Sequence, residues 1–314
     1  MRVAVLGATS QIAKDLIRSM GESGRYQLFL FARRPEALRE FLKGRADAAV
    51  AYAGDYASFS TDQEFDALIN FVGVGNPAAA AQMGADILDV TLQFDQLALN
   101  YLRAHPQCRY IFLSSGAAYG SNFERPVDAD SSASIAINHL KPQDWYGVAK
   151  LHAECRHRAL PQLPIVDVRV FNYFSYTQDL SARFFITDVL RAIESGETLE
   201  TSPDNIVRDY IGPGDFFQLI SKILASPIVN DVLDCYTREP VDKITLLESM
   251  KERFGLRYEF SPASVGINAT GLKMNYFSKS RRAEAFGYAP AKNSLQTVLG
   301  EAARVLPGHG PLER

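Results

Sequence analysis

The side chains best suited to chemistry are Ser115, Tyr146 and Lys150. Tyr146 and Lys150 stand four positions apart, a spacing that places two side chains on one face of a helix. Ser115 ends the apolar run 108–115, which is typical of a buried strand. Such a trio can relay a proton to a carbonyl oxygen, because a nearby cation makes tyrosine a usable acid and base. A tyrosine and a lysine at this spacing also occur by chance on solvated helices, so other motifs must support the interpretation.

The amino terminus predicts a dinucleotide-binding turn. The apolar strand 2–6 runs directly into Gly7, and a helical pattern follows with Ile12, Leu16 and Met20 apolar. A strand, a tight turn and a helix form the setting in which backbone N–H groups meet a pyrophosphate. Ser10 and Ala13 stand where the second and third glycines of the usual fingerprint would be, so an ordinary strand–helix turn is the alternative. The predicted cofactor contacts of this turn are Gly7, Thr9, Ser10, Gln11 and Ile12.

Two arginines follow the second predicted strand, 26–32. An enzyme selective for NAD usually has a carboxylate here to hold the ribose hydroxyls, whereas Arg33 and Arg34 suit the additional phosphate of NADP. The sequence therefore favours NADP, with NAD still possible, and a solvated basic turn before Pro35 is the alternative reading. The predicted cofactor set also includes Tyr146 and Lys150.

The next two predicted strands supply further cofactor contacts. Asp55 follows the strand predicted at 48–53, where it could touch the adenine. The strand predicted within 65–73 ends in Val72 and Gly73, whose small side chains would let the adenosine half lie close to the backbone.

In their order along the chain, these motifs resemble those of the extended short-chain dehydrogenase/reductase family, NAD(P)-dependent epimerases, dehydratases and reductases of nucleotide sugars. The similar segments are the Gly7 turn, Ser114–Gly120, Tyr146–Lys150, Arg169–Asn172 and Arg208–Ile211. The resemblance covers nearly the whole chain and implies that Ser115, Tyr146 and Lys150 are catalytic. It also implies that Asn172 and Arg208 contact the diphosphate of a nucleotide-sugar substrate.

Departures from the family pattern narrow the expected reaction. The family's 4,6-dehydratases carry an Asp-Glu pair directly after the catalytic serine or threonine, and here Gly116 and Ala117 stand there. The cysteine and histidine of the family's epimerase-reductases also have no counterpart at their places. Our leading expectation is NADP(H)-dependent reduction of the 4-keto group of a nucleotide-diphosphate 4-keto-6-deoxy sugar. The alternatives are a nucleotide-sugar 4-epimerase that retains NAD(P), and a non-catalytic dinucleotide-binding sensor.

The element pattern predicts an α/β fold, a Rossmann-type doubly wound parallel sheet with a small, mostly helical substrate lobe. The expected dinucleotide-binding domain is 1–170, with about 205–236 returning to it, and the substrate-binding lobe is 171–204 and 237–314. By resemblance, the helical stretches 78–103 and 145–160 would pair in a homodimer, although they could equally just cover the sheet.

Composition excludes several other classes of function. A net charge of −3 argues against binding nucleic acid or an anionic membrane through bulk electrostatics. Three scattered cysteines suggest neither a disulfide framework nor a metal site. The first apolar run is far too short for a secretory signal, and no run approaches the ~18 residues needed to span a bilayer, so we expect a cytoplasmic enzyme.

Overall fold

The centre of the molecule is a seven-stranded parallel sheet in the order β11-β6-β5-β4-β1-β2-β3. The computed structural model describes residues 1–43, 49–74, 80, 82–261 and 273–306. The strands are β1 (Arg2–Leu6), β2 (Gln27–Phe31), β3 (Val50–Gly54), β4 (Ala67–Asn70), β5 (Arg109–Ser115), β6 (Ile165–Val170) and β11 (Asp231–Asp234). The sequence predicted the first five of these, β1 to β5, to within a few residues.

Side-chain alternation gives the sheet two buried faces. On β1, Val3 and Val5 join one apolar core while Ala4 and Leu6 join another, and all four are fully buried. A strand points successive side chains to opposite faces, so an uninterrupted apolar run requires cover on both sides. Helices provide that cover on each side of the sheet.

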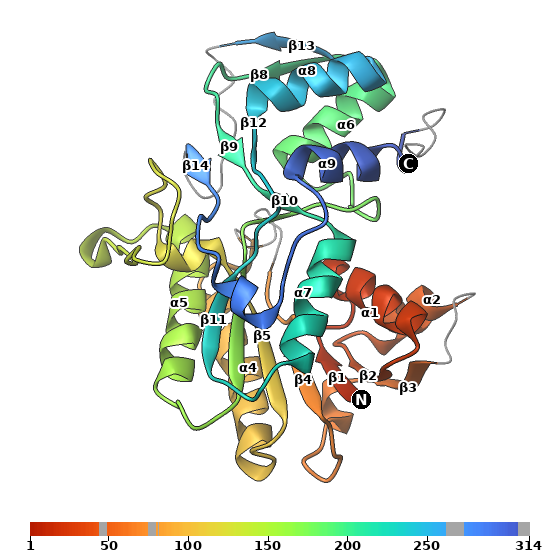
Figure 1. Ribbon diagram of the computed structural model, residues 1–314, viewed down its shortest axis with the longest axis vertical. Helices are drawn as coiled ribbons and strands as arrows, with labels where there is room; N and C mark the ends of the chain where they lie inside the picture. Colours follow the sequence, from red (N-terminus) through yellow and green to blue (C-terminus); the bar gives the residue numbers. More distant parts are fainter. Residues whose placement is uncertain (44–48, 75–79, 81, 262–272, 307–314) are drawn as a thin grey trace.

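The helices divide between the two faces as a doubly wound fold requires. Helices α1 (Gln11–Ser23), α2 (Pro35–Leu42) and α7 (Pro213–Ala225) contribute to the first core. Helices α4 (Asp86–Ala104) and α5 (Trp145–Arg158) cover the other face (Figure 1). The predicted Rossmann-type fold is confirmed.

A smaller lobe stands beyond the carboxyl ends of the strands, at the top of Figure 1. Its apolar core comes from α6 (Phe185–Ser195), α8 (Lys243–Phe254) and α9 (Ser294–Ala302). The region after residue 243 was expected to be helical, yet it also supplies two short strands. These are β13 (Arg257–Phe260), paired with β8 (Thr198–Thr201), and β14 (Asn275–Tyr276), paired with β9 (Val207–Arg208).

The strand order reverses between β1 and β4, and ligands of open α/β sheets bind at such a point. The turn after β1 and the turn after β4 therefore lie at the same edge of the sheet. Ser10 begins α1 as its N-cap, because its Oγ accepts a hydrogen bond from the Ala13 N–H at 3.3 Å. The cap fixes where the helix starts relative to the turn.

Asp15 joins α1 to the strand that leads into the smaller lobe. This buried carboxylate accepts hydrogen bonds from the hydroxyls of Tyr173 at 2.9 Å, Ser175 at 2.6 Å and Thr177 at 2.9 Å. Tyr173 ends β7 (Asn172–Tyr173), which directly follows β6 in the chain. One carboxylate thus holds the first helix against the chain as it leaves the sheet.

We expect Asp15→Ala to lower the free energy of unfolding by about 3 kcal/mol, because buried hydroxyls would lose their acceptor. Urea denaturation measures this change. Asp62→Ala is the control, since Asp62 is exposed and its carboxylate accepts a hydrogen bond from the neighbouring Ser60 hydroxyl at 3.1 Å. Equal stability of the two variants would contradict the assigned role of Asp15.

Candidate active site

Ser115 lies at the carboxyl end of β5, the edge where this sheet can bind ligands. Its side chain is buried, and its Oγ accepts a hydrogen bond from the Ala117 N–H at 3.2 Å. The Oγ also lies 3.3 Å from the hydroxyl of Tyr276, which comes from β14 of the smaller lobe. The Ser115 side chain thus contacts residues of both the larger and the smaller lobe.

Tyr146 and Lys150 reach the same place from the first turns of α5. Burial raises the pKa of Tyr146, and a hydrogen bond with Ser115 opposes that rise. The Lys150 Nζ donates to the Leu113 carbonyl at 2.7 Å and lies 5.9 Å from the centre of the Tyr146 ring. Burial lowers the pKa of Lys150 to about 8. The structure therefore brings together the three side chains that the sequence singled out for proton relay.

Two glycines allow α5 and β6 to approach Ser115 closely. A Cβ at Gly147 would lie 2.6 Å from the Ala117 carbonyl oxygen, and one at Gly116 would lie 2.4 Å from the Phe171 ring. Contacts this short do not occur, so neither position can hold a larger residue without movement of its neighbours. An acidic side chain at Gly116 is thus sterically incompatible with this packing.

The turn after β1 fits a dinucleotide pyrophosphate. Gly7 has φ +76°, and a Cβ there would lie 2.8 Å from the backbone of Phe71, so the position requires glycine. The first N–H groups of a helix have no partner inside it, which leaves those of Gln11 and Ile12 available to an anion. Thr9 lies in the same turn, and the Gln11 side chain donates to the Ser175 hydroxyl at 3.0 Å.

The other predicted cofactor residues differ in their exposure and in their contacts. Arg33 and Arg34 are exposed between β2 and α2. Asp55 is exposed, and its carboxylate accepts the Ser58 N–H at 3.1 Å, a local cap that leaves the adenine contact a prediction. Gly73 lies beside the relay, because a Cβ built on it would lie 3.4 Å from the Lys150 Nζ.

The side chain of Asn70 supports the backbone next to Gly73. Its Oδ1 accepts the Val72 N–H at 2.9 Å, which shapes the chain as it leaves β4.

Two cations gather where Asn172 and Arg208 were predicted to contact a diphosphate. The Arg208 guanidinium donates to the Val207 and Lys273 carbonyls, and the ammonium of Lys273 lies 4.4 Å from the Tyr276 ring centre. Neither cation pairs with a carboxylate anywhere in the described part of the chain. Burial and the nearby Arg208 lower the pKa of Lys273 to about 8, against the opposing charge of Asp144.

Sequence reasoning missed Lys273 and Tyr276. Tyr276 lies 161 positions from Ser115, and no motif links the two segments. A weak signal was present, because no acidic residue occurs between Glu259 and Glu284 although this stretch contains several cations. Asn172 closes the group, since its amide donates to the Asp209 carbonyl at 3.3 Å and the Tyr276 carbonyl at 3.4 Å.

Within the described ranges, no group of His, Cys, Asp and Glu is arranged to hold a metal ion. A search of the same residues found no helix with the length and apolarity needed to cross a membrane.

The sequence profile of the NAD-dependent epimerase/dehydratase family matches residues 3–233. The chain belongs to this family. It is therefore an NAD(P)-dependent enzyme of the extended short-chain dehydrogenase/reductase type, and the predicted resemblance is confirmed. A search of curated protein sequences found no match.

Solved structures with the same fold include three sugar-nucleotide epimerases. UDP-glucuronic acid 4-epimerase from Bacillus cereus, in complex with UDP-glucuronic acid and NAD, is 15% identical with a TM-score of 0.77 over 97% of this chain and 99% of that one. UDP-N-acetylglucosamine 4-epimerase from Methanobrevibacter ruminantium is 14% identical with a TM-score of 0.79 over 96% of each chain. UDP-glucose 4-epimerase from Bifidobacterium longum, in complex with NAD+ and UDP, is 17% identical with a TM-score of 0.74 over 97% and 98%.

Membership of the NAD-dependent epimerase/dehydratase family implies a nicotinamide dinucleotide as the cofactor. The turn at Gly7 fits that group on its own geometry, because its left-handed glycine and the first turn of α1 leave room and N–H groups for a pyrophosphate.

Proposed function

We propose that this enzyme is a nucleotide-sugar 4-epimerase that acts on a uridine-diphosphate sugar and retains its nicotinamide cofactor. The observation that carries the proposal is the meeting of Ser115, Tyr146 and Lys150 beside Gly73, with no second acid or base at Gly116 or Ala117. The solved structures of 4-epimerases with NAD or UDP-sugars support it further. Our initial preference from the sequence was 4-keto reduction, and the comparisons favour its alternative.

The three side chains divide the proton chemistry among them. Ser115 donates a hydrogen bond that orients the oxygen on carbon 4 of the sugar. Tyr146 removes the proton from this hydroxyl and returns it later, acting as base and then acid. Lys150 stabilises the tyrosinate with its charge. A bound nicotinamide dinucleotide supplies reversible hydride transfer, and inversion follows when the keto sugar presents its other face.

The packing around Gly116 argues against a dehydratase. Loss of water from a sugar needs an acid and a base near carbons 5 and 6, and family dehydratases carry them directly after the catalytic serine or threonine. Phe171 fills the space that a side chain at Gly116 would need, and Ala117 has no titratable group. The described residues at this edge of the sheet therefore favour a reaction at carbon 4 alone over one that also involves carbons 5 and 6.

Arg208 and Lys273 would bind the diphosphate of the substrate. Lys273 is buried and Arg208 is half-buried, and neither forms an ion pair among the described residues. Cations removed from water without such a partner are costly, and a bound dianion would offset that cost. The amide of Asn172 lies with them and could donate to the same phosphates.

We expect Lys273→Gln to weaken binding of UDP by about tenfold or more, as loss of a charge-assisted contact predicts. Calorimetric titration measures the affinity, and inorganic pyrophosphate should show the same loss. Lys279→Gln is the matched control, because Lys279 is an exposed lysine of the same segment. Equal affinities in both variants would remove Lys273 from the substrate site.

Net reduction of a 4-keto sugar remains a second candidate because β2 is followed by Arg33 and Arg34 rather than by a carboxylate. NADPH is the reductant that such a reaction would consume. The cytoplasmic location, the homodimer and the domain boundaries stay predictions.

If these arginines read the additional phosphate, the wild-type enzyme should bind NADP(H) more tightly than NAD(H), and the double variant R33A/R34A should lose that preference. Calorimetry with each cofactor measures both affinities. A wild type that binds NAD(H) equally or better would leave the two arginines as a solvated turn and favour retained NAD.

The decisive assay supplies a panel of UDP-hexoses and separates the products by chromatography. We expect two sugars that differ only at carbon 4 to interconvert, with no net change in reduced-nicotinamide absorbance. Tyr146→Phe should lower this turnover roughly 10²–10⁴-fold with cofactor binding intact, the usual loss for a positioned acid and base. Tyr258→Phe, on β13 of the outer lobe, should leave turnover unchanged.

Stoichiometric oxidation of NADPH by a nucleotide-diphosphate 4-keto-6-deoxy sugar would instead establish the reductase. Cofactor binding without turnover of either substrate class would point to the non-catalytic sensor.

A further inference from the structure

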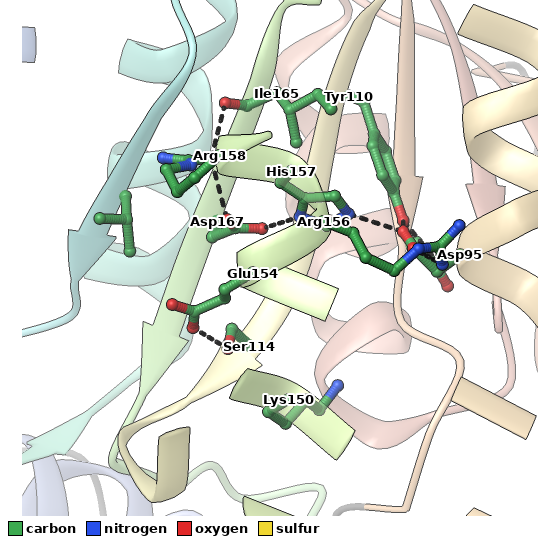
Figure 2. A network of polar contacts seen from close by, with 12 residues as sticks. Asp95, Tyr110, Ser114, Lys150, Glu154, Arg156, His157, Arg158, Ile165 and Asp167 are labelled. Carbon is green, nitrogen blue, oxygen red and sulfur yellow. Dashed lines mark hydrogen bonds and ion pairs between the residues drawn. The ribbon is translucent and has the colours of Figure 1, made fainter. Parts of the chain in front are cut away.

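A buried cluster of charged side chains lies behind the relay, between α4, α5 and β6. His157 on α5 sits between two carboxylates, with its Nδ1 2.6 Å from Asp167 and its Nε2 2.7 Å from Asp95. The side chains of all three are fully buried. In Figure 2, His157 lies farther along α5 than Lys150, with Asp167 and Asp95 on either side of it. None of them has a part in the proton relay proposed above.

The geometry requires a protonated His157. Ionised carboxylates only accept hydrogen bonds, so a histidine that contacts one through each nitrogen must donate from both. Burial by itself would lower the pKa of His157, but Asp167 and Asp95 outweigh it and raise the pKa to about 9. The imidazolium thus lies between the two carboxyl groups and contacts each of them through one ring nitrogen.

The two carboxylates are also paired at their outer sides. Arg156 donates to Asp95 at 2.5 Å, and Arg158 donates to Asp167 at 2.9 Å. The arginine side chains are 21% and 35% exposed, so water screens their charge far more than that of the buried trio. Within this group, Asp167 and Asp95 are the charges that raise the pKa of Lys150, so their field is the one that favours its ammonium.

Lys150 faces this field from the same side of α5. Lys150, Glu154 and His157 follow the spacing of one helix face, and seven residues span about 10 Å along the axis. The Lys150 side chain is buried, with the Leu113 carbonyl as acceptor and the Phe112 ring 4.4 Å from its Nζ. Desolvation disfavours such an ammonium, and the charges of Glu154, Asp167 and Asp95 oppose that effect.

A hydrogen-bond chain also joins the cluster to the backbone at Gly73. The Tyr110 hydroxyl donates to Asp95 at 3.1 Å and accepts from the Asn70 amide at 3.0 Å. Asn70 in turn accepts the Val72 N–H at 2.9 Å, one residue before the glycine that borders Lys150. The cluster is therefore hydrogen-bonded, through Tyr110 and Asn70, to the strand end that borders Lys150.

We propose that the Asp95–His157–Asp167 cluster keeps Lys150 protonated from behind α5, which makes these buried side chains positioning residues of the relay. The inference rests on the proposed role of Lys150 in catalysis. A purely apolar filling of this space would be at least as stable, since buried ion pairs often contribute little net stability. Apolar side chains in this space would exert no long-range electrostatic field on Lys150.

The titratable groups on the elements around Lys150 set the sign of each expected shift. They are Tyr146, Glu154, Arg156, His157 and Arg158 on α5, Tyr110 on β5, Asp167 and Arg169 on β6, and Asp95 on α4. Glu154 is itself paired with Arg169 and accepts the Ser114 hydroxyl. Removal of a carboxylate lowers the pKa of Lys150, whereas removal of an arginine does not.

The test breaks one ion pair from each side. Asp167→Asn should lower the pKa of Lys150 by about one unit, because a buried anion is lost while an acceptor for His157 remains. Arg158→Gln breaks the same pair but should leave that pKa at or above its wild-type value of about 8. NMR titration of isotope-labelled lysine measures both, with the Lys150 signal assigned by Lys150→Arg.

The pH dependence of turnover should shift in the same direction as the pKa of Lys150. Rising pH removes the charge that favours tyrosinate, so the alkaline limb of the turnover profile should move to lower pH in Asp167→Asn only. Asp215→Asn is the control, since this buried carboxylate on α7 accepts the Ala291 N–H at 2.7 Å and lies outside the cluster. If Asp167→Asn does not fold, Asp95→Asn tests the same sign from α4.

Equal shifts in the aspartate and arginine variants, or no shift in either, would overturn the inference and leave a structural cluster. The titration needs no substrate, so it separates the two proposals. A shifted Lys150 pKa in a protein that turns over no nucleotide sugar would contradict the proposed function alone. Turnover with an unmoved Lys150 pKa would contradict the cluster's role alone.

Discussion

A buried ammonium is the constraint around which this active site is arranged. Lys150 is almost removed from water, and its nearest partners are a carbonyl oxygen and an aromatic ring rather than a carboxylate. A direct salt bridge would stabilise the ammonium more strongly, but the carboxylate would then neutralise the charge that acts on Tyr146. Carboxylates at longer range on α4, α5 and β6 can favour the cation and still leave it free to act on the tyrosine.

The same requirement accounts for the close packing at this edge of the sheet. Glycine at 147 lets α5 approach the chain after Ser115, and glycine at 73 lets the end of β4 approach Lys150. Ser115 and Lys150 are buried at this edge, and burial strengthens the electrostatic interactions between such groups. Closely packed backbone also fixes the distances between side chains that come from different elements.

The second lobe contributes through a few specific contacts. Asp15 ties α1 to the chain that leaves the sheet, while Tyr276 places a hydroxyl from β14 against Ser115. Arg208 and Lys273 come from paired strands of that lobe or lie beside them, and neither forms an ion pair with a carboxylate among the described residues. In the proposed mechanism the two lobes share one site, with proton transfer at the edge of the sheet and recognition of the substrate diphosphate in the smaller lobe.

Local signals in the sequence determined much of this protein. Apolar runs that end in glycine or serine specified the strands, and the tyrosine–lysine spacing specified one helix face, because both depend only on the periodicity of the backbone. Motif order then sufficed to place the chain in its family. Tertiary structure alone decided which distant residues meet: Tyr276 with Ser115, Lys273 with Arg208, and His157 with its two carboxylates. The environment of His157 could not be predicted from the sequence, since no local pattern distinguishes a solvated histidine from a buried imidazolium. Its charge depends on Asp95 and Asp167, which only the packing of α4 and β6 against α5 brings within hydrogen-bonding distance.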